Sequence, residues 1–258
     1  MPETAERDAV SRAPAALSEL RRVAIVPALN EEHTVPRVIA ELRSFDPGLD
    51  IVVIDDGSTD RTADVAESLG AYVLRLPFNV GIGGAVQTGF RFAHERHYDI
   101  AVRVDGDGQH DPSQIGRVLE PVLAGRADIV VGSRFAADEG GYRSSRSRRV
   151  GIRILAAVVS RVVGQRVTDT TSGFQALNRR GIALFAADYP HDYPEVEATV
   201  MVFRHRLRLA EVAVSMRERG GGSSSITALH SIYYMVKVLL AIFVGLFRRN
   251  VVPQDDSL

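Results

Sequence analysis

Two aspartates separated by one residue carry the clearest chemical signal in the chain. They belong to the segment DGDGQH at 105–110, which directly follows an apolar, β-branched run. Alternate residues at the end of a strand point the same way, so Asp105 and Asp107 can aim two carboxylates at one point, with Gln109 as a further oxygen ligand. Oxygen-only ligands suit Mg²⁺ or Mn²⁺, which bridge carboxylates to substrate phosphates. The alternative is an ordinary Asp/Gly turn leaving a strand.

Two further polar segments follow apolar runs, PALNEE at 27–32 and DDGSTD at 55–60. If these runs are adjacent parallel strands, the two segments share one rim with the aspartate pair. A carboxylate at such a rim accepts a hydrogen bond from a base N–H or a ribose hydroxyl, so Asp56 and Glu31 are expected on the nucleotide side of a site. Asp60 could equally cap a helix, and the residues around Glu31 could instead open the next helix.

Five short apolar runs must position these loops. They are VAIVPAL at 23–29, IVVIDD at 51–56, YVLRLP at 72–77, DIAVRVD at 99–105 and DIVVGSR at 128–134. A helix-compatible segment follows each run, as is typical of parallel strands that alternate with helices. Helix starts are marked by Ser58 or Thr59 and by Asp111 with Pro112. The sequence therefore predicts an open, mostly parallel α/β sheet with helices on both faces, which binds ligands at the carboxyl ends of its strands.

A glycine-rich run, GIGGAVQTG at 81–89, suggests a dinucleotide-binding fingerprint but does not match it. The pattern G-x-G-x-x-G from Gly81 requires glycine at position 86, where the chain has Val86, and no phosphate-binding G-x-x-x-x-G-K-[ST] occurs. This disfavours a dinucleotide-dependent oxidoreductase. A helix start near phosphates and a tight contact between helix and sheet remain as alternatives.

Composition excludes several classes of protein. The 258 residues include 31 basic and 32 acidic side chains and no cysteine. The net charge of −1 excludes binding of nucleic acid through bulk charge, and the lack of cysteine excludes disulfide frameworks, thiolate metal sites and cysteine nucleophiles. Residues 1–19 contain no apolar core of a signal peptide, so a cytoplasmic location is expected.

The second half of the chain combines basic and apolar segments. A loop rich in Gly, Ser and Arg is expected at 138–149, followed by an amphipathic helix at 150–164. Such a basic stretch is either simply solvated or binds phosphate at an anionic membrane surface. The arginines considered for phosphate binding are Arg146, Arg148 and Arg149.

An apolar segment at 226–247 contains few charges but is marginal in length for a membrane-spanning helix. We expect it to lie at a membrane interface, to be re-entrant or to dock a partner, with packing on the protein's own core as the alternative. The expected organisation is a tail at 1–20, one domain at 21–222, an apolar helix at 223–250 and a tail at 251–258.

Six motifs in order resemble those of family 2 glycosyltransferases with the GT-A fold, and among them the polyprenyl-phosphate, or dolichol-phosphate mannose synthase-like, hexosyltransferases. The motifs are PALNEE, DDGSTD, NVGIGGAVQTG, DGDGQHDP, DIVVGSRF and TDTTSGFQALNRR. The resemblance covers about residues 23–219. The chain departs from it at Ile82, where many relatives have Lys or Leu, and in having one apolar C-terminal segment where some relatives have two or four membrane helices.

The resemblance implies transfer of a hexose from a nucleoside diphosphate sugar, with inversion at the anomeric carbon. As donor we expect a UDP-hexose before GDP-mannose. It implies Mg²⁺ or Mn²⁺ as cofactor. The residues implied on the nucleotide-sugar side are Pro27, Leu29, Asn30, Glu31, Asp56, Gly83, Asp105 and Gly106.

On the acceptor side the resemblance implies a polyprenyl phosphate at the cytoplasmic face of the membrane. Asp169 corresponds to the residue that orients the acceptor or acts as base, and Asp107 to the second metal carboxylate. Glu197 corresponds to the acidic residue that opens a late helix, whereas Glu195 is expected at an exposed helix start. His110 is expected either to contact the leaving phosphate or acceptor, or to support the residues that do.

Other readings stay open within and beyond this family. The acceptor could be a diffusible molecule or a protein, with the apolar segment packed internally. The chain could also be a nonenzymatic subunit that docks a membrane partner through residues 226–247. A small membrane-protein partner or a homodimer fits either reading.

Overall fold

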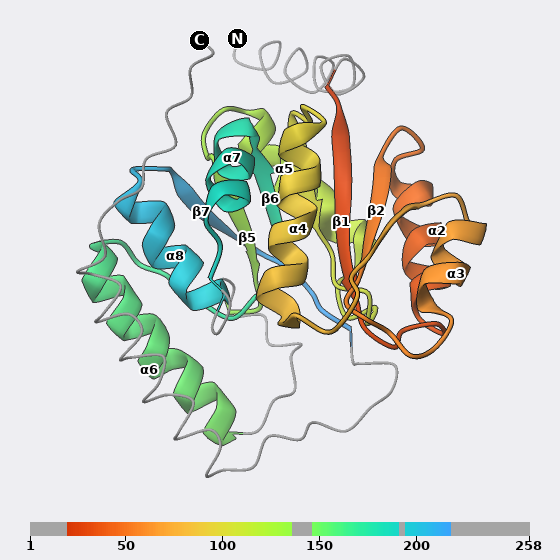
Figure 1. Cartoon of the computed structure of the whole chain (residues 1–258). Helices are drawn as coiled ribbons and strands as arrows, with labels where there is room; N and C mark the ends of the chain where they lie inside the picture. Colours follow the sequence, from red (N-terminus) through yellow and green to blue (C-terminus); the bar gives the residue numbers. More distant parts are fainter. Residues whose placement is uncertain (1–19, 136–145, 191–193, 218–258) are drawn as a thin grey trace, which may run out of the picture.

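The computed structural model describes residues 20–135, 146–190 and 194–217, with the side chains of 146–153 outside that description. Within these residues the chain forms a seven-stranded sheet in the order β3-β2-β1-β4-β6-β5-β7 (Figure 1). The strands are β1 (Arg22–Ala28), β2 (Asp50–Asp55), β3 (Tyr72–Arg75), β4 (Ile100–Arg103), β5 (Ile129–Ser133), β6 (Gln175–Asn178) and β7 (Leu209–Ala213).

The five predicted strands are confirmed, and four of them, β1 to β4, pair in parallel. Strand β6 is antiparallel to both of its neighbours, β4 and β5, and β7 is parallel to β5. Strands β6 and β7 were not predicted, because β6 has a polar residue at each end and Glu211 interrupts the apolar run of β7. The sheet is therefore mixed and mostly parallel, as predicted.

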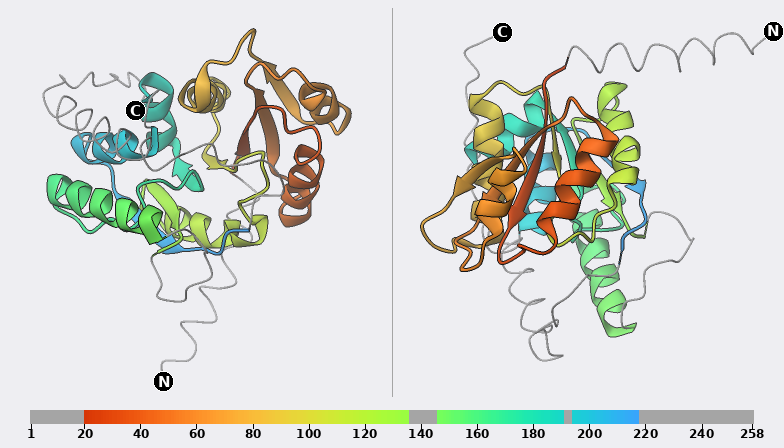
Figure 2. Two further views of the ribbon diagram at one scale, coloured as in Figure 1. Left: turned by 90° about the horizontal axis from the view of Figure 1, so that it is seen from below. Right: turned by 90° about the vertical axis from the view of Figure 1, so that its right-hand side faces the viewer.

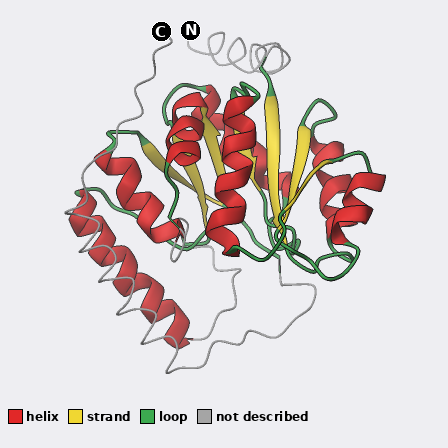
Figure 3. Cartoon of the chain, viewed as in Figure 1, coloured by secondary structure: helices red, strands yellow, loops and turns green. Residues whose placement is uncertain are grey.

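Helices cover both faces of this sheet, as the cartoon by secondary structure shows (Figure 3). They are α2 (Val35–Phe45), α3 (Thr62–Ser68), α4 (Gly81–Glu95), α5 (Ile115–Leu123), α6 (Arg146–Val163), α7 (Arg179–Ala187) and α8 (Pro194–Arg204), with a 3₁₀ turn η1 at Pro112–Gln114. The side chain of Asp111 accepts a hydrogen bond from the Ser113 N–H, so the predicted start of this segment is confirmed.

Successive residues of the central strands are buried on opposite faces. Val23 and Ile25 of β1 pack with α4, α7 and α8, whereas Ala24 and Val26 pack with α2, α3 and α5. Because helices cover both faces of the sheet, nearly every residue of these strands is buried and apolar, and the strands form continuous apolar runs in the sequence. The two layers of helices leave the carboxyl ends of β1 and β2 at one edge of the sheet, the lower edge in Figure 1.

Helix α6 packs on α8 instead of on the sheet, through Leu155 and Val159 against Val196 and Val200. It extends past the edge of the sheet in two perpendicular views (Figures 1 and 2). The predicted amphipathic helix is confirmed, but the predicted loop at 138–149 is wrong in its last four residues. These are helical because residues 146–149 contain no glycine or proline to end the helix.

None of the helices in the described part of the chain is long and apolar enough to cross a membrane. The predicted apolar segment at 226–247, the basic residues before position 146 and the two predicted tails lie outside the described residues, apart from Leu20.

Gly89 in α4 lies so close to β1 that an added Cβ atom would be 2.2 Å from Cγ2 of Ile25. We expect Gly89→Ala to lower the free energy of unfolding by about 1–2 kcal/mol, because overpacking costs about 1–3 kcal/mol and exceeds the gain of about 1 kcal/mol in helix propensity. Urea denaturation followed by circular dichroism measures this change.

Gly116 in α5 is the matched control, since the nearest atom to an added Cβ is 4.0 Å away. Gly116→Ala is expected to leave the protein equally stable or to stabilise it by up to about 1 kcal/mol. Equal effects of the two substitutions would contradict the proposed contact between α4 and β1.

Candidate active site

The loops after β1 and β2 are joined by hydrogen bonds into one unit. The Asn30 side-chain oxygen accepts from the Thr59 N–H at 2.9 Å, and the Asn30 N–H donates to the Ser58 hydroxyl at 2.9 Å. Asn30 has a φ of 56°, a left-handed conformation that asparagine tolerates. Ser58 and Thr59 therefore do not start a helix as predicted, because they are bonded to the neighbouring loop.

Asp60 and the acidic residues after β1 extend this connection. The Asp60 carboxylate accepts from the N–H groups of Thr62 and Glu32, at 2.9 and 3.2 Å, and so ties the start of α3 to the first loop. Burial alone would raise the pKa of Asp60, but hydrogen bonds from the Thr62 hydroxyl and from these N–H groups hold it below its usual value. The backbone oxygen of Glu31 accepts from the N–H groups of Thr34 and Val35, so Glu31 begins the turn that leads into α2, whose N-cap is Thr34. Its place on the nucleotide side stays a prediction.

Asp56 lies under the first turn of α4 and is only 5% exposed. One of its carboxylate oxygens accepts from the Val80 N–H at 2.7 Å and the other from the Gly81 N–H at 3.1 Å. It thus holds the amino end of a helix whose partial positive charge favours a carboxylate. Gly83 is buried in the same helix, and nucleotide binding by Asp56 and Gly83 stays a prediction.

The aspartate pair lies at the same edge, directly after β4. The backbone N–H of Gly106 donates to the carbonyl oxygen of Pro27 at 3.1 Å, which joins the loop to β1. Exposure alternates along the loop, with Asp105, Asp107 and Gln109 half-exposed and the residues between them buried. This alternation agrees with the expectation that the three side chains share one side.

These side chains are chemically suited to a hard divalent cation. They offer half-exposed oxygen atoms and no nitrogen or sulfur ligand, and the described residues contain no cluster of three or more His, Cys, Asp and Glu that could hold a metal by itself. A cation bound by two carboxylates and an amide needs further oxygen ligands from its substrate, as Mg²⁺ and Mn²⁺ sites commonly do. The donor set therefore fits the predicted ion.

A buried arginine that the sequence analysis missed lies beneath this pair. Arg103, at the end of β4, is 1% exposed and donates to Asp105 at 3.3 Å, to the Tyr189 hydroxyl at 3.2 Å and to Glu195 at 3.0 Å. Burial alone would raise the pKa of Asp105, but the positive charge of Arg103 holds it below its usual value. The signal that could have revealed Arg103 is a charged residue inside an otherwise apolar strand.

Glu195 is therefore not the exposed helix start that was expected. Its side chain is 17% exposed and bonded to Arg103, because the buried guanidinium requires a second carboxylate besides Asp105. Glu197 lies in the first turn of α8, as predicted.

His110 supports the aspartate loop from behind. Its Nδ1 atom accepts a hydrogen bond from the Asp105 N–H at 3.0 Å, and its ring stacks on Phe174 with 5.0 Å between ring centroids. Burial lowers the pKa of His110, which favours the neutral ring that this acceptor role requires. Of the two predicted roles, the contacts favour support of the site residues. Arg217 secures the loop further, since its N–H donates to the Gln109 carbonyl oxygen.

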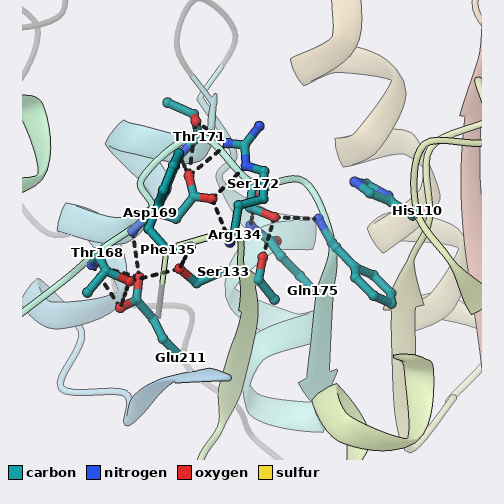
Figure 4. Close-up of polar contacts among 12 residues, drawn as sticks. His110, Ser133, Arg134, Phe135, Thr168, Asp169, Thr171, Ser172, Gln175 and Glu211 are labelled. Carbon is teal, nitrogen blue, oxygen red and sulfur yellow. Dashed lines mark hydrogen bonds and ion pairs between the residues drawn. The ribbon is translucent and has the colours of Figure 1, made fainter. Parts of the chain in front are cut away.

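Asp169, in the region predicted to face the acceptor, is the centre of a second set of charged and polar side chains (Figure 4). Arg134 forms two side-chain hydrogen bonds with the Asp169 carboxylate, each 2.8 Å long, and its backbone N–H adds a third. The backbone N–H and the hydroxyl of Thr171 also donate to Asp169. Burial alone would raise the pKa of Asp169, but the hydrogen bonds and charge of Arg134 lower it below its usual value.

Such a carboxylate is poorly suited to act as a base. The Asp169 side chain is fully buried, and each of its oxygens accepts hydrogen bonds. Of its two predicted roles, orientation is therefore favoured over proton abstraction. The side chains of Arg146, Arg148 and Arg149 lie outside the described residues, although their backbone forms the first turn of α6.

Glu211 on β7 holds the backbone before Asp169 in place. Its carboxylate accepts from the N–H groups of Thr168 and Asp169, and the Thr168 hydroxyl also contacts the hydroxyl of Ser133 at 2.8 Å (Figure 4). The sequence analysis missed Glu211, which is the acidic residue within the apolar run LAEVAV.

The two charged regions touch one another. A Cβ atom added to Gly173 would be 2.7 Å from a guanidinium nitrogen of Arg103 and 3.1 Å from an Asp105 carboxylate oxygen. The loop that carries Asp169 and Gly173 thus lies directly against the loop that carries Asp105.

Comparison with known proteins gives this site a family context. Residues 23–184 match the model of glycosyl transferase family 2. The chain is 34% identical over 217 residues to the undecaprenyl-phosphate mannosyltransferase of Micrococcus luteus, covering 81% of this chain and 88% of that protein. It is 30% identical over 228 residues to the polyprenol monophosphomannose synthase of Mycolicibacterium smegmatis, covering 84% and 85%.

The fold is also that of a solved structure. A crystal structure of glucosyl-3-phosphoglycerate synthase from Mycobacterium tuberculosis, in complex with Mn²⁺, UDP and glucosyl-3-phosphoglycerate, superposes with a TM-score of 0.70 at 24% sequence identity. The match covers 92% of this chain and 84% of that one, which supports the mixed α/β fold.

We expect Asp169→Asn to destabilise the protein by about 3–5 kcal/mol at neutral pH, because it removes the charge of one member of the buried ion pair that Asp169 forms with Arg134. The pKa of Asp169 is lower in the folded protein than its ordinary value of 3.8. The carboxylate therefore stabilises the fold above that value, and the difference from wild type should shrink as the pH falls below it. Urea denaturation at several pH values measures both effects.

Glu120→Gln is the matched control, since Glu120 and Arg126 form an ion pair in which both side chains are exposed. Its cost should stay below about 1 kcal/mol. A similar cost for both substitutions would show that the Arg134–Asp169 pair contributes no more than a surface pair.

Proposed function

The chain belongs to glycosyl transferase family 2, and from this premise we propose that it transfers a hexose from a nucleoside diphosphate sugar to a polyprenyl phosphate, with inversion at the anomeric carbon. The two relatives from Micrococcus luteus and Mycolicibacterium smegmatis are named for mannosyl transfer to polyprenyl carriers. The observation that carries the proposal is the contact of Gly173 with Asp105 and Arg103, because it brings the Asp169 loop against the aspartate pair.

The donor occupies the joined loops of β1, β2 and β4 in this proposal. Leu29, which is 39% exposed at this edge, would contact the nucleoside together with Asn30. Asp56 would act by holding the amino end of α4, to which both of its oxygens are bonded. The amino end of α4 faces the same edge, where its partial positive charge favours an anionic diphosphate. Both UDP-hexoses and GDP-mannose are candidates.

Asp105, Asp107 and Gln109 would hold a Mg²⁺ or Mn²⁺ ion on the diphosphate. When bound, such an ion neutralises the negative charge that grows on the leaving diphosphate as the glycosidic bond breaks. Arg103 and His110 orient the carboxylate and backbone of Asp105 for this role. The protein thus presents ligands that need little rearrangement during the reaction.

The acceptor in this proposal is a phosphate monoester, which is already ionised near neutral pH and needs orientation more than a base. This requirement matches Asp169, whose carboxylate fixes Arg134 instead of remaining available for a proton. Arg146, Arg148 and Arg149 begin α6, which extends past the sheet edge, and would bind phosphate at the cytoplasmic face of a membrane. The segment at 223–250 would keep the domain at 21–222 there.

Replacing the second aspartate of the metal pair tests the reaction. Asp107→Asn should lower Mn²⁺-dependent transfer to a polyprenyl phosphate by about a thousandfold or more, because it removes several kcal/mol of transition-state stabilisation. Transfer from radiolabelled UDP-glucose, UDP-N-acetylglucosamine and GDP-mannose measures the loss and identifies the donor.

Asp64→Asn is the matched control. It removes an exposed carboxylate of α3 that pairs with Arg75 of β3, and it should leave transfer unchanged. Two results together would contradict the metal site: the wild-type enzyme keeps its turnover after the metal is chelated, and Asp107→Asn turns over as fast as wild type. Transfer only to a diffusible or protein acceptor would retain the family chemistry but exclude the lipid acceptor, and no transfer to any acceptor would favour a nonenzymatic subunit.

The α6 arginines have a separate test. Replacing Arg146, Arg148 and Arg149 by Gln should raise the KM for polyprenyl phosphate and its dependence on salt, since each arginine near an anionic surface contributes about 1 kcal/mol. Donor binding, measured by calorimetry, should not change.

The control for charge is a triple replacement by Gln at the opposite end of the sheet, at the exposed residues Arg43, Arg126 and Arg179. It should leave the acceptor KM and its salt dependence unchanged. Identical behaviour of the two triple variants would remove the α6 arginines from the acceptor site.

A further inference from the structure

Arg103 places a buried positive charge directly behind the predicted metal ligand. Its Nε atom is 3.3 Å from one carboxylate oxygen of Asp105, and its side chain is 1% exposed. A divalent cation at Asp105 therefore shares that carboxylate with a second cation, the guanidinium. Two like charges on one carboxylate repel each other, and the repulsion is poorly screened where water is excluded.

Glu195 is the group that offsets this repulsion. It reaches Arg103 from α8, with 3.0 Å between a carboxylate oxygen and a guanidinium nitrogen, and its side chain is 17% exposed. The third partner of Arg103, the Tyr189 hydroxyl, accepts a hydrogen bond without adding charge. The buried guanidinium is thus balanced by a carboxylate that lies outside the metal loop.

The contact with Gly173 keeps this arrangement in place. An added Cβ atom there would be 2.7 Å from a guanidinium nitrogen and 2.8 Å from Cζ of Arg103, so the loop backbone covers the guanidinium closely. The guanidinium thus lies between this loop backbone and its charged partners, Asp105 and Glu195. The charge of Arg103 must therefore be compensated where it lies.

We propose that Glu195 is a positioning residue that sets the divalent-cation affinity of the site by neutralising Arg103. The inference rests on the proposed function, which places the ion at Asp105 and Asp107. With Glu195 ionised, Arg103 orients one oxygen of Asp105 while the carboxylate retains its charge toward the ion. Without the negative charge of Glu195, the guanidinium of Arg103 orients Asp105 but weakens the binding of the ion by that carboxylate.

The experiment is a titration of the full chain with Mn²⁺, with and without UDP, in which electron paramagnetic resonance measures the free ion. Glu195→Gln keeps the shape and an oxygen acceptor for Arg103 but removes the charge, and should raise the dissociation constant for Mn²⁺ about tenfold. Glu195→Asp keeps the charge and should stay within about threefold of wild type. Arg103→Met combined with Glu195→Gln removes both charges and should restore most of the lost affinity.

Asp50→Asn is the matched control, since it removes a carboxylate that bonds the Tyr98 hydroxyl at the opposite end of the sheet. It should leave the affinity for Mn²⁺ unchanged, and circular dichroism should show that every variant is folded. If the double variant does not fold, the comparison of Glu195→Gln with Glu195→Asp decides the question alone.

The outcomes separate this inference from the proposed function. Unchanged Mn²⁺ affinity in Glu195→Gln overturns the inference while the metal site stands. An equally weak double variant shows that the loss in Glu195→Gln does not come from the charge of Arg103, which also overturns the inference. A wild-type protein that binds no Mn²⁺ under either condition overturns the metal site itself and this inference with it.

Discussion

The buried guanidinium of Arg103 is the constraint on which the arrangement of the site depends. An unpaired charge in a protein interior costs several kcal/mol, so this residue must be surrounded by groups that compensate it. The compensating groups come from three parts of the chain, namely Asp105 after β4, Tyr189 after α7 and Glu195 on α8. Meeting this one requirement brings the second half of the chain against the first.

The loops around this centre are held by bonds between side chains and backbone. Asn30, Asp56 and Asp60 each accept from backbone N–H groups of a neighbouring loop or helix start. Glu211 does the same for the segment that leads to Asp169. Loops carry backbone groups that the sheet does not satisfy, and an acidic or amide side chain is the natural acceptor for them. Hydrogen bonds of this kind therefore tie the loops at the site edge to one another and to the helix starts.

The sequence predicted the elements with strong local patterns and missed those defined by distant contacts. The runs at 23–29 and 51–56 are buried on both faces and were found as strands, whereas β6 is antiparallel and short and was not. Glu195 looked like an exposed helix start, because nothing near it in the sequence shows that Arg103 lies opposite. Arg103 and Glu211 were missed for the same reason, since a single charge within an apolar run reveals burial but not its partner.

Residue type alone also does not separate ligand-binding groups from structural ones within a motif. Asp56 and Asp169 lie in motifs of the family, yet their oxygens already accept hydrogen bonds from the protein and their side chains are buried. Asp105, Asp107 and Gln109 are half-exposed, and their loop is supported by His110 and Arg103 from the side away from solvent. A motif thus encodes both the groups that would meet a ligand and the scaffold that aims them. Because a carboxylate serves equally well in either role, only exposure and existing partners distinguish the two, and both depend on the folded structure.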